Sequence, residues 1–196
     1  LDSELLLGHV LGLQRMDIYL AHDRPMSEEE LTALRPLVSR RGKREPLAWI
    51  VGQQSFHTLE LSVSPDVLVP RPDTETLVEA ALKWFDHTTD PLYVADVGCG
   101  SGAIGLALAS VLPGIRLYAI DQCSKAIACT RHNVQRLEFN QRVGVLMGDL
   151  LQPVPTSRPI DWVVSNPPYI KSAVLQTLQP EVSSFEPKTA LDGGED

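Results

Sequence analysis

The chain of 196 residues is 43% hydrophobic and 21% charged, as in ordinary globular proteins, which excludes disordered and collagen-like classes. Its formal net charge of −8 argues against broad electrostatic binding of nucleic acid, because such binding usually needs a basic face. No apolar stretch is long enough to cross a bilayer, and the amino end lacks the basic-then-apolar pattern of a signal peptide. We therefore expect a cytoplasmic protein that does not bind membranes, with no direct binding of nucleic acid.

The first part of the chain, residues 1–54, is predicted to be a small helical domain that docks a substrate. Apolar residues recur at helical spacing over 5–13, and a second helix follows the Ser-x-x-Glu capping box at Ser27. A third, short helix is expected over 46–51. The basic cluster at 40–44 is either a local docking patch or a solvated helix end.

Residues 55–72 are predicted to form a β-hairpin linker. A turn at Ser64-Pro65-Asp66 would fold the strand before it onto residues 67–69, because Ser, Pro and Asp favour turns. Proline on both sides of Arg71 stiffens the exit, and Asp73 or Thr74 is expected to cap the next helix.

Residues 73–196 show strands alternating with helices, which predicts an α/β domain with a doubly wound, mainly parallel sheet. The expected strands cover 92–98, 115–121, 142–149 and 160–166, and helices are expected over 103–112 and 125–137. Only about four strands are readable, and the last residues have the composition of a turn, so we expect the C-terminal strands of this domain to be missing. In such sheets ligands bind at the carboxyl ends of the strands.

A glycine-rich turn joins the first of these strands to its helix, with Gly98, Gly100 and Gly102 in the sequence DVGCGSG. Glycine permits a tight turn and lets a ligand approach backbone N–H groups at a helix start. With Ala103 the stretch also satisfies G-x-G-x-x-G/A, so a dinucleotide-binding oxidoreductase stays open at this point.

Acidic residues stand at successive strand ends. Asp121 can accept both hydroxyls of a ribose, which suits an adenosine of NAD or of S-adenosylmethionine, although it can instead cap the following helix. Asp149 can accept a hydrogen bond from an adenine amino group or simply form a turn. Asp96 orients the glycine loop or lies near the cationic end of a ligand.

The fourth strand ends in Asn166-Pro167-Pro168-Tyr169. The Asn166 side chain and the Pro167 carbonyl are two fixed acceptors that can hold both protons of a planar –NH₂ group, and the Tyr169 ring can lie against its flat face. Such a nitrogen is a poor nucleophile, so orientation and electrostatics would activate it without a strong base. The three cysteines form no CxxC pair and lack histidines at zinc spacing, so we predict reduced thiols and no metal site.

Together, DVGCGSG, Asp121, GDL and NPPY resemble the class I S-adenosylmethionine-dependent methyltransferases that modify planar nitrogens. The leucine-rich start, GKREPLAWIVGQQSF, VLVPRPDTETLVE and LQPEVSSFEPKTALDGGED resemble the HemK/PrmC family of release factor glutamine N5-methyltransferases over essentially the whole chain. The resemblance implies a Rossmann-like enzyme of translation termination. It would methylate the glutamine of the Gly-Gly-Gln loop of peptide-chain release factors, its protein partners. Separately, we expect a monomer.

The resemblance also implies the site residues. The catalytic group would be Asn166, Pro167 and Tyr169, and the substrate-binding group adds Pro168. S-adenosylmethionine, which leaves as S-adenosylhomocysteine, would be bound by Gly98, Cys99, Gly100, Ser101, Gly102, Asp121, Asp149, Leu150 and Asn166. One departure is Cys123, where the family often has serine, which puts capping of the following helix in question.

Other substrates and roles stay open. A sister group methylates a glutamine of a ribosomal protein, but it typically carries Pro-Arg-Ser where this chain has Pro70-Arg71-Pro72. Amino-methyltransferases of nucleic-acid bases, at adenine N6 or guanine N2, share the NPPY motif. A non-enzymatic module that binds the cofactor and only docks onto release factors is the third alternative.

Overall fold

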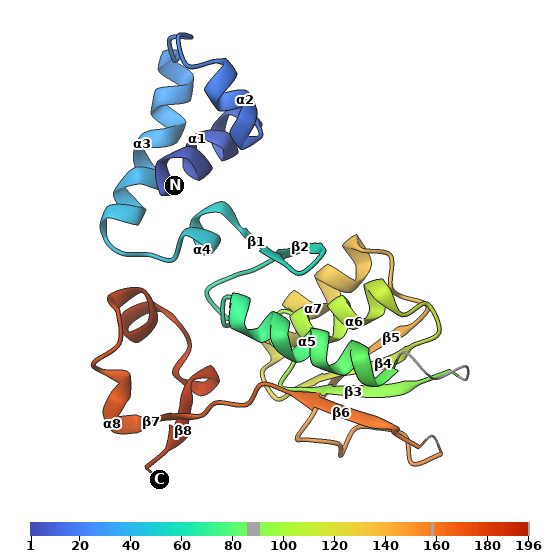
Figure 1. Cartoon of the computed structure of the whole chain (residues 1–196). Coiled ribbons are helices and arrows are strands. Elements are labelled where there is room, and N and C mark those ends of the chain that lie inside the picture. The colour runs from blue at the N-terminus through green and yellow to red at the C-terminus, as the bar shows by residue number, and fades with distance from the viewer. Residues whose placement is uncertain (86–90, 158, 196) are drawn as a thin grey trace.

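The computed structural model describes residues 1–85, 91–157 and 159–195 (Figure 1). Along the chain we distinguish the helical region (residues 1–52), a β-hairpin, the α/β region (residues 72–165) and the C-terminal segment (residues 166–194). The prediction of an α/β fold preceded by a small helical part is confirmed.

The helical region contains short helices that begin and end at recognisable signals. They are α1 (Asp2–Leu11), α2 (Arg15–Leu20), α3 (Glu28–Gly42) and α4 (Leu47–Val51). The capping box predicted at Ser27 is confirmed: the Glu30 N–H donates to Ser27 Oγ at 3.2 Å, and the Ser27 N–H donates to Glu30 Oε2 at 2.8 Å. Helix α1 ends at Gly12, whose φ of 65° is the left-handed conformation that glycine adopts at helix ends.

Helix α2 was not predicted, because it buries no residue and so has no apolar periodicity to detect. Polar contacts with α1 hold it instead. The Tyr19 hydroxyl donates to Glu4 Oε1 at 2.6 Å, and Arg15 pairs with Glu4 Oε2 at 2.9 Å.

The basic cluster at the end of α3 is neither a free docking patch nor a simply solvated helix end. Arg41 pairs with Asp2 at 2.6 Å and with Glu181 at 3.0 Å, and Arg44 pairs with Glu181 at 2.7 Å. The two pairs with Glu181 connect the helical region to the C-terminal segment, which lies beneath it in Figure 1.

The hairpin pairs β1 (Gln53–Phe56) with β2 (Leu59–Ser62), antiparallel. The turn predicted at residues 64–66 is present, since the Val67 N–H donates to the Ser64 carbonyl at 3.1 Å, but it does not join a hairpin. The predicted pairing across it is wrong: the strand pairs with the residues before it, across a turn that contains His57 (φ 53°). Residues 67–69 follow in a non-regular stretch whose two valines are buried. Helix α5 (Pro72–Phe85) then starts at Pro72, so neither Asp73 nor Thr74 is its cap; proline suits a first helical position because its missing N–H would be unpaired there.

In the described part of the α/β region, a four-stranded parallel sheet has the order β5-β4-β3-β6. Its strands are β3 (Tyr93–Val97), β4 (Arg116–Asp121), β5 (Val143–Met147) and β6 (Trp162–Ser165), joined in part by α6 (Ala103–Val111) and α7 (Ser124–Arg136). These elements confirm the predicted ones within a few residues. The strand order reverses between β3 and β6, which makes their carboxyl ends the expected ligand crevice.

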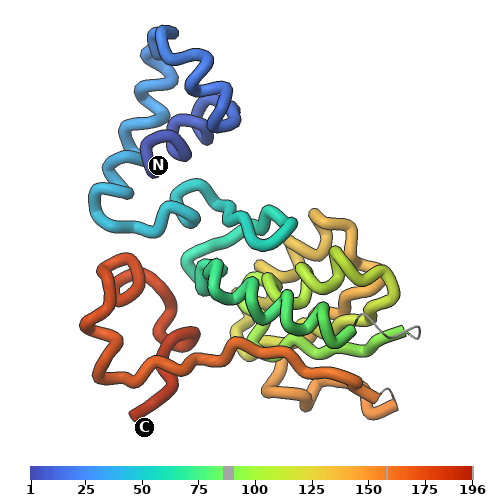
Figure 2. The backbone as a smooth tube through the Cα atoms, in the orientation of Figure 1, coloured from blue at the N-terminus to red at the C-terminus, as the bar shows by residue number. Residues whose placement is uncertain are grey.

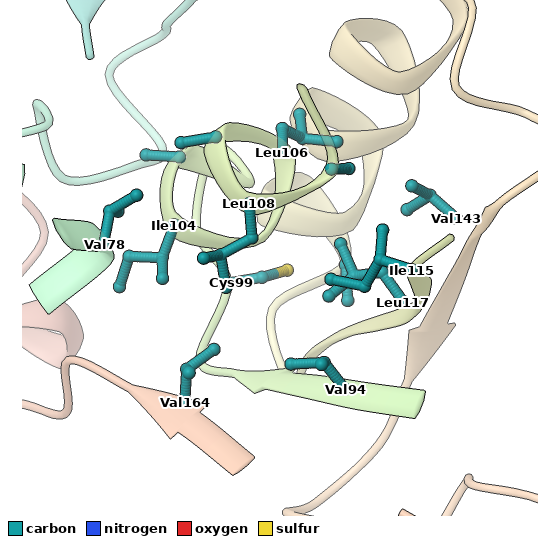
Figure 3. Packing of buried hydrophobic residues seen from close by; sticks show 14 of the residues in the cluster. Val78, Val94, Cys99, Ile104, Leu106, Leu108, Ile115, Leu117, Val143 and Val164 are labelled. Atoms are coloured by element: carbon teal, nitrogen blue, oxygen red, sulfur yellow. The ribbon is translucent and has the colours of Figure 1, made fainter. Parts of the chain in front are cut away.

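The core lies between the sheet and the helices on one of its faces, where Figure 1 shows α5, α6 and α7. Figure 3 shows Leu106 and Leu108 of α6 among the side chains that pack there with strand residues such as Val94 and Val164. Strand alternation turns Val163 to the opposite face, where it is half exposed.

Beyond β6 the chain leaves the sheet and forms the C-terminal segment, which Figure 2 shows beside the α/β region in orange and red. Its elements are β7 (Ile170–Lys171), α8 (Ser172–Leu175), a π-helical turn (Glu181–Phe185), a 3₁₀ turn (Lys188–Ala190) and β8 (Asp192–Gly194). Strands β7 and β8 pair in parallel, so the end of the chain returns to the Asn-Pro-Pro-Tyr motif. None of the helices in the described stretches combines the length and apolarity that a bilayer crossing requires.

Candidate active site

The glycine loop follows β3 at the crevice. Gly98, Gly100 and Gly102 all have positive φ, between 57° and 84°, which L-residues with side chains rarely adopt. A Cβ added at Gly98 or Gly100 would meet no atom within 4 Å, whereas one at Gly102 would lie 2.9 Å from the Leu106 side chain. The first two glycines therefore leave open a concave surface, and the third allows close packing of α6.

Asp121, at the end of β4, fixes this loop. One carboxylate oxygen accepts the Gly100 N–H at 2.9 Å, and the other accepts the Cys123 N–H at 2.9 Å. The N-cap of α7 is Cys123 and not Asp121, and the Cys123 side chain makes no capping bond, in line with the capping question that this departure raised. Each carboxylate oxygen keeps a lone pair that can accept a ligand hydroxyl.

Asp96 is almost fully buried beneath the loop and supports α6. Its Oδ2 accepts the Gly105 N–H at 2.9 Å, and Oδ1 has no partner within the described residues. Burial raises the pKa of this carboxyl to about 7, although the Gly105 hydrogen bond opposes the shift. Asp96 thus fixes the first turn of α6 and does not itself line the cavity described below.

A cavity of about 520 Å³ opens between the loop and the C-terminal segment, a size that suits a nucleotide-like ligand. Its lining includes Gly98, Gly100, Asp121, Leu150 and Asn166 of the predicted cofactor set. We call it the cofactor cavity.

The other predicted cofactor residues do not line that cavity; they are Cys99, Ser101, Gly102 and Asp149. The side chains of Cys99 and Ser101 are buried behind the loop, so only their backbone can take part. Asp149 accepts a hydrogen bond from Gln122 Nε2 at 2.6 Å, and it is Gln122 that lines the cavity.

A second cavity, of about 370 Å³, lies on the other side of the Asn-Pro-Pro-Tyr motif, and we call it the acceptor cavity. Its lining is mainly apolar: Leu68, Leu77, Ile170, Leu178, Val182, Ala190 and Leu191, with Arg71, Asp73, Thr74, Asn166, Pro167 and Tyr169. Leu68, Asn166, Pro167 and Ala190 line both cavities and form a shared wall. Of the predicted substrate residues, Pro168 lines only the cofactor cavity and Tyr169 only the acceptor cavity.

The amide of Asn166 is oriented by the first turn of α5. Its Nδ2 donates to Thr74 Oγ1 at 3.5 Å, a long hydrogen bond, and no donor reaches Oδ1 among the described residues. Oδ1 is therefore the atom that remains to accept a hydrogen bond from a ligand.

Two contacts from the C-terminal segment brace this wall. Glu186 is buried, accepts the Val69 N–H at 3.3 Å and pairs with Arg71, so it attaches the segment to the stretch that carries Leu68. Gly193 packs on the motif itself, because a Cβ there would lie 2.8 Å from Tyr169 Cα and 3.0 Å from the Pro168 carbonyl oxygen.

Sequence reasoning missed Leu68, Thr74, Gln122 and Ala190 as cavity residues. Leu68 gave a signal in the sequence, because it lies between two valines in a stretch predicted as a strand, where alternation would turn it away from them. The other three follow from tertiary packing and carried no local pattern.

Comparison with known proteins shows that the chain belongs to the methyltransferase class. A model described as the methyltransferase small domain matches residues 75–181, and one described as the PrmC N-terminal domain matches residues 1–52. The human METTL16 catalytic domain, solved with an RNA hairpin, has a TM-score of 0.55 at 16% identity, over 70% of this chain and 52% of that one. That likeness shows a methyltransferase fold.

The relatives identify the family. A protein named release factor glutamine methyltransferase from Geobacter sulfurreducens is 46% identical over 100% of this chain and 67% of its own length. The protein of the same name from Rhodospirillum rubrum is 43% identical over 100% of this chain and 59% of its own length. The chain thus spans about three fifths to two thirds of these relatives. It belongs to the release factor glutamine methyltransferase family, which confirms the predicted family and enzyme class.

Proposed function

We propose that this chain transfers a methyl group from S-adenosylmethionine to the side-chain amide nitrogen (N5) of the glutamine in the Gly-Gly-Gln motif of peptide-chain release factors. The observation that carries the proposal is the wall shared by the two cavities, with Asn166 and Pro167 exposed to both. Relatives whose names state this substrate support the choice of acceptor. We also keep the predictions of a cytoplasmic monomer.

The cofactor cavity fits S-adenosylmethionine. Gly98 and Gly100 leave room where any side chain would intrude, and Asp121 offers carboxylate oxygens to the ribose hydroxyls. Leu150 and Gln122 line the cavity, which supports the proposal that they flank the adenine. When bound, the cofactor supplies the methyl group as an electrophile on a sulfonium sulfur.

The acceptor cavity fits a glutamine side chain. Asn166 Oδ1 and the Pro167 carbonyl oxygen accept the two N–H bonds of the amide, and Tyr169 packs against its plane. These acceptors orient the nitrogen toward the shared wall and stabilise the positive charge that develops as it attacks, which is the electrostatic contribution expected of a preorganised site. The apolar lining reduces access of water to the reacting atoms.

The test is transfer of labelled methyl with release factor, ribosomal protein and DNA as parallel substrates. We expect label in the release factor, at the glutamine of Gly-Gly-Gln. Label in DNA and none in a release factor would contradict the proposal, and label confined to the ribosomal protein would reassign the substrate to the sister group.

The mechanism is tested with Asn166→Ala, for which we expect turnover to fall by about 10²-fold or more, as for loss of an oriented hydrogen-bond partner. Asn140→Ala, at an exposed position outside both cavities, is the matched control and should leave turnover unchanged. Near-normal turnover in a folded Asn166→Ala protein would mean that the amide is not held in this way.

A further inference from the structure

Helix α7 carries two polar side chains that are completely buried, Thr130 and Asn133. They are three residues apart and so lie on the same side of the helix. A buried polar side chain is costly unless it is hydrogen-bonded, so their partners show what they do.

Asn133 uses its whole amide on two segments that are distant in sequence. Its Oδ1 accepts the Ser62 N–H at 2.8 Å, and its Nδ2 donates to the Ser62 carbonyl at 2.9 Å and to the Ser101 carbonyl at 2.9 Å. The first two bonds imitate a neighbouring strand for the last residue of β2. The third holds the glycine loop.

Thr130 holds the adjacent peptide of the same loop. Its hydroxyl donates to the Gly100 carbonyl at 2.8 Å and accepts from the Cys99 thiol at 3.4 Å. Burial raises the pKa of Cys99, which keeps its thiol protonated as a donor. Since the peptide group is planar, fixing the Gly100 carbonyl also fixes the N–H of Ser101 on the opposite side.

Both sides of the cofactor cavity are therefore attached to one helix. The glycine loop contributes Gly98 and Gly100, and the stretch that follows β2 contributes Asp66 and Leu68. Lys125, also on α7, pairs with Asp66 at 2.7 Å and adds a third attachment.

We propose that Thr130 and Asn133 are positioning residues of the methyltransferase site: Thr130 sets the glycine loop for the cofactor, and Asn133 couples that loop to the hairpin and so to the shared wall. The proposal rests on the proposed function for the identity of the cofactor. It assigns the two residues different effects, since only Asn133 reaches the chain that leads to Leu68 and Arg71.

Thr130→Val and Thr130→Ser form the first test, with binding of S-adenosylhomocysteine measured by calorimetry. Thr130→Val keeps the shape and removes the hydroxyl, so we expect affinity to fall about tenfold, the equivalent of one hydrogen bond, while KM for the release factor is unchanged. Thr130→Ser restores the hydroxyl and should bind within about twofold of wild type. Equal affinity of all three proteins would overturn the role of Thr130.

Asn133→Asp is the second test, because aspartate keeps the acceptor for Ser62 but points an oxygen at two carbonyls. We expect weaker binding of S-adenosylhomocysteine and a raised KM for the release factor, each by about tenfold. A loss of thermal stability with both constants unchanged would show a structural role only and overturn the coupling. If Asn133→Asp does not fold, the Thr130 pair still decides the cofactor half. Failure of the wild type itself to bind S-adenosylhomocysteine would instead refute the proposed function.

Discussion

The helical region and the α/β region are stabilised in opposite ways. Helix α6 is buried over all its residues from Ala103 to Ala109, whereas α3, with fifteen residues, has none that is fully buried. In the helical region the buried apolar side chains are few, mainly Leu6 of α1 and residues 48–50 of α4, and polar contacts add to them: the capping box at Ser27, the contacts of Glu4, and the ion pairs of Arg41. Such contacts near the surface stabilise far less than a buried leucine does, because solvent screens them.

The candidate active site lies on the well-packed α/β region. The glycine loop and the Asn-Pro-Pro-Tyr motif both begin at the ends of core strands, so their backbones are held by the sheet. The helical region contributes no residue to either cavity. Its contacts with the site are indirect, through Glu181 in the C-terminal segment and through Ala48 and Trp49, which pack with the valines on either side of Leu68.

Truncation of a core leucine should show the contrast most strongly. Leu106→Ala removes a completely buried side chain, and we expect a loss of about 2–5 kcal/mol in the free energy of unfolding, from lost burial and a cavity. Leu20→Ala in α2, which is 78% exposed, should change it by about 0.5 kcal/mol or less. Urea unfolding measures both; similar losses would remove the contrast.

The two regions should also differ in the sign of their pH dependence. Burial raises the pKa of Asp96 from 3.8 to about 7, so the folded state binds more protons than the unfolded state between these values. Its contribution to stability therefore falls as the pH rises from about 4 to about 7, by up to a few kcal/mol. In the helical region, Arg24 and Ser27 lower the pKa of Glu30, whose contribution is instead lost as the pH falls below 4.5.

Unfolding of Asp96→Asn and Glu30→Gln at several pH values, each compared with wild type, checks these signs. The difference between wild type and Asp96→Asn should decrease from pH 5 to pH 8. The difference for Glu30→Gln should decrease toward pH 3. The same slope for both variants would contradict the assignment.

The smallest effect is expected at the start of α3. Ser27→Ala removes the acceptor of the Glu30 N–H and should cost about 1 kcal/mol. Ser39→Ala, at an exposed position within the same helix, is the control and should be neutral or slightly stabilising, since alanine favours helices. Circular dichroism during thermal unfolding measures both. Equal effects would mean that the capping box does not stabilise this helix.

The sequence predicted the elements that have a strong local pattern. The alternation of strands and helices in residues 92–166 and the capping box at Ser27 depend on neighbouring residues, so they could be read directly. The hairpin was placed wrongly because Ser64-Pro65-Asp66 is the stronger turn signal in the sequence. The turn that joins the two hairpin strands instead contains His57 in a left-handed conformation. Helix α2 was not predicted because its hydrogen bond and ion pair are made by polar side chains with a residue that is distant in sequence.

For the site, too, residues with a local sequence pattern could be predicted, and residues placed by long-range packing could not. Asp121, Asn166 and the glycines stand at strand ends, so the sequence could locate them, and Gly98, Gly100, Asp121 and Asn166 do line one cavity. That Thr74 orients Asn166, that Gln122 and not Asp149 faces the cavity, and that Gly193 packs on Tyr169 depend on long-range packing. A motif locates such a site, whereas the groups that orient it come from elsewhere in the chain.

The shared wall has a consequence for ligand design. Because Leu68, Asn166, Pro167 and Ala190 line both the cofactor cavity and the acceptor cavity, the two cavities adjoin. If the proposed function holds, a single molecule that joined an adenosyl amino acid to an amide by a short link would occupy both at once. Its second half would then bind at a high effective concentration, so its affinity would exceed that of either half. On the proposed function, substitutions in the wall would weaken such a ligand together with the cofactor and the glutamine substrate, so few of them would exclude the ligand and spare methyl transfer.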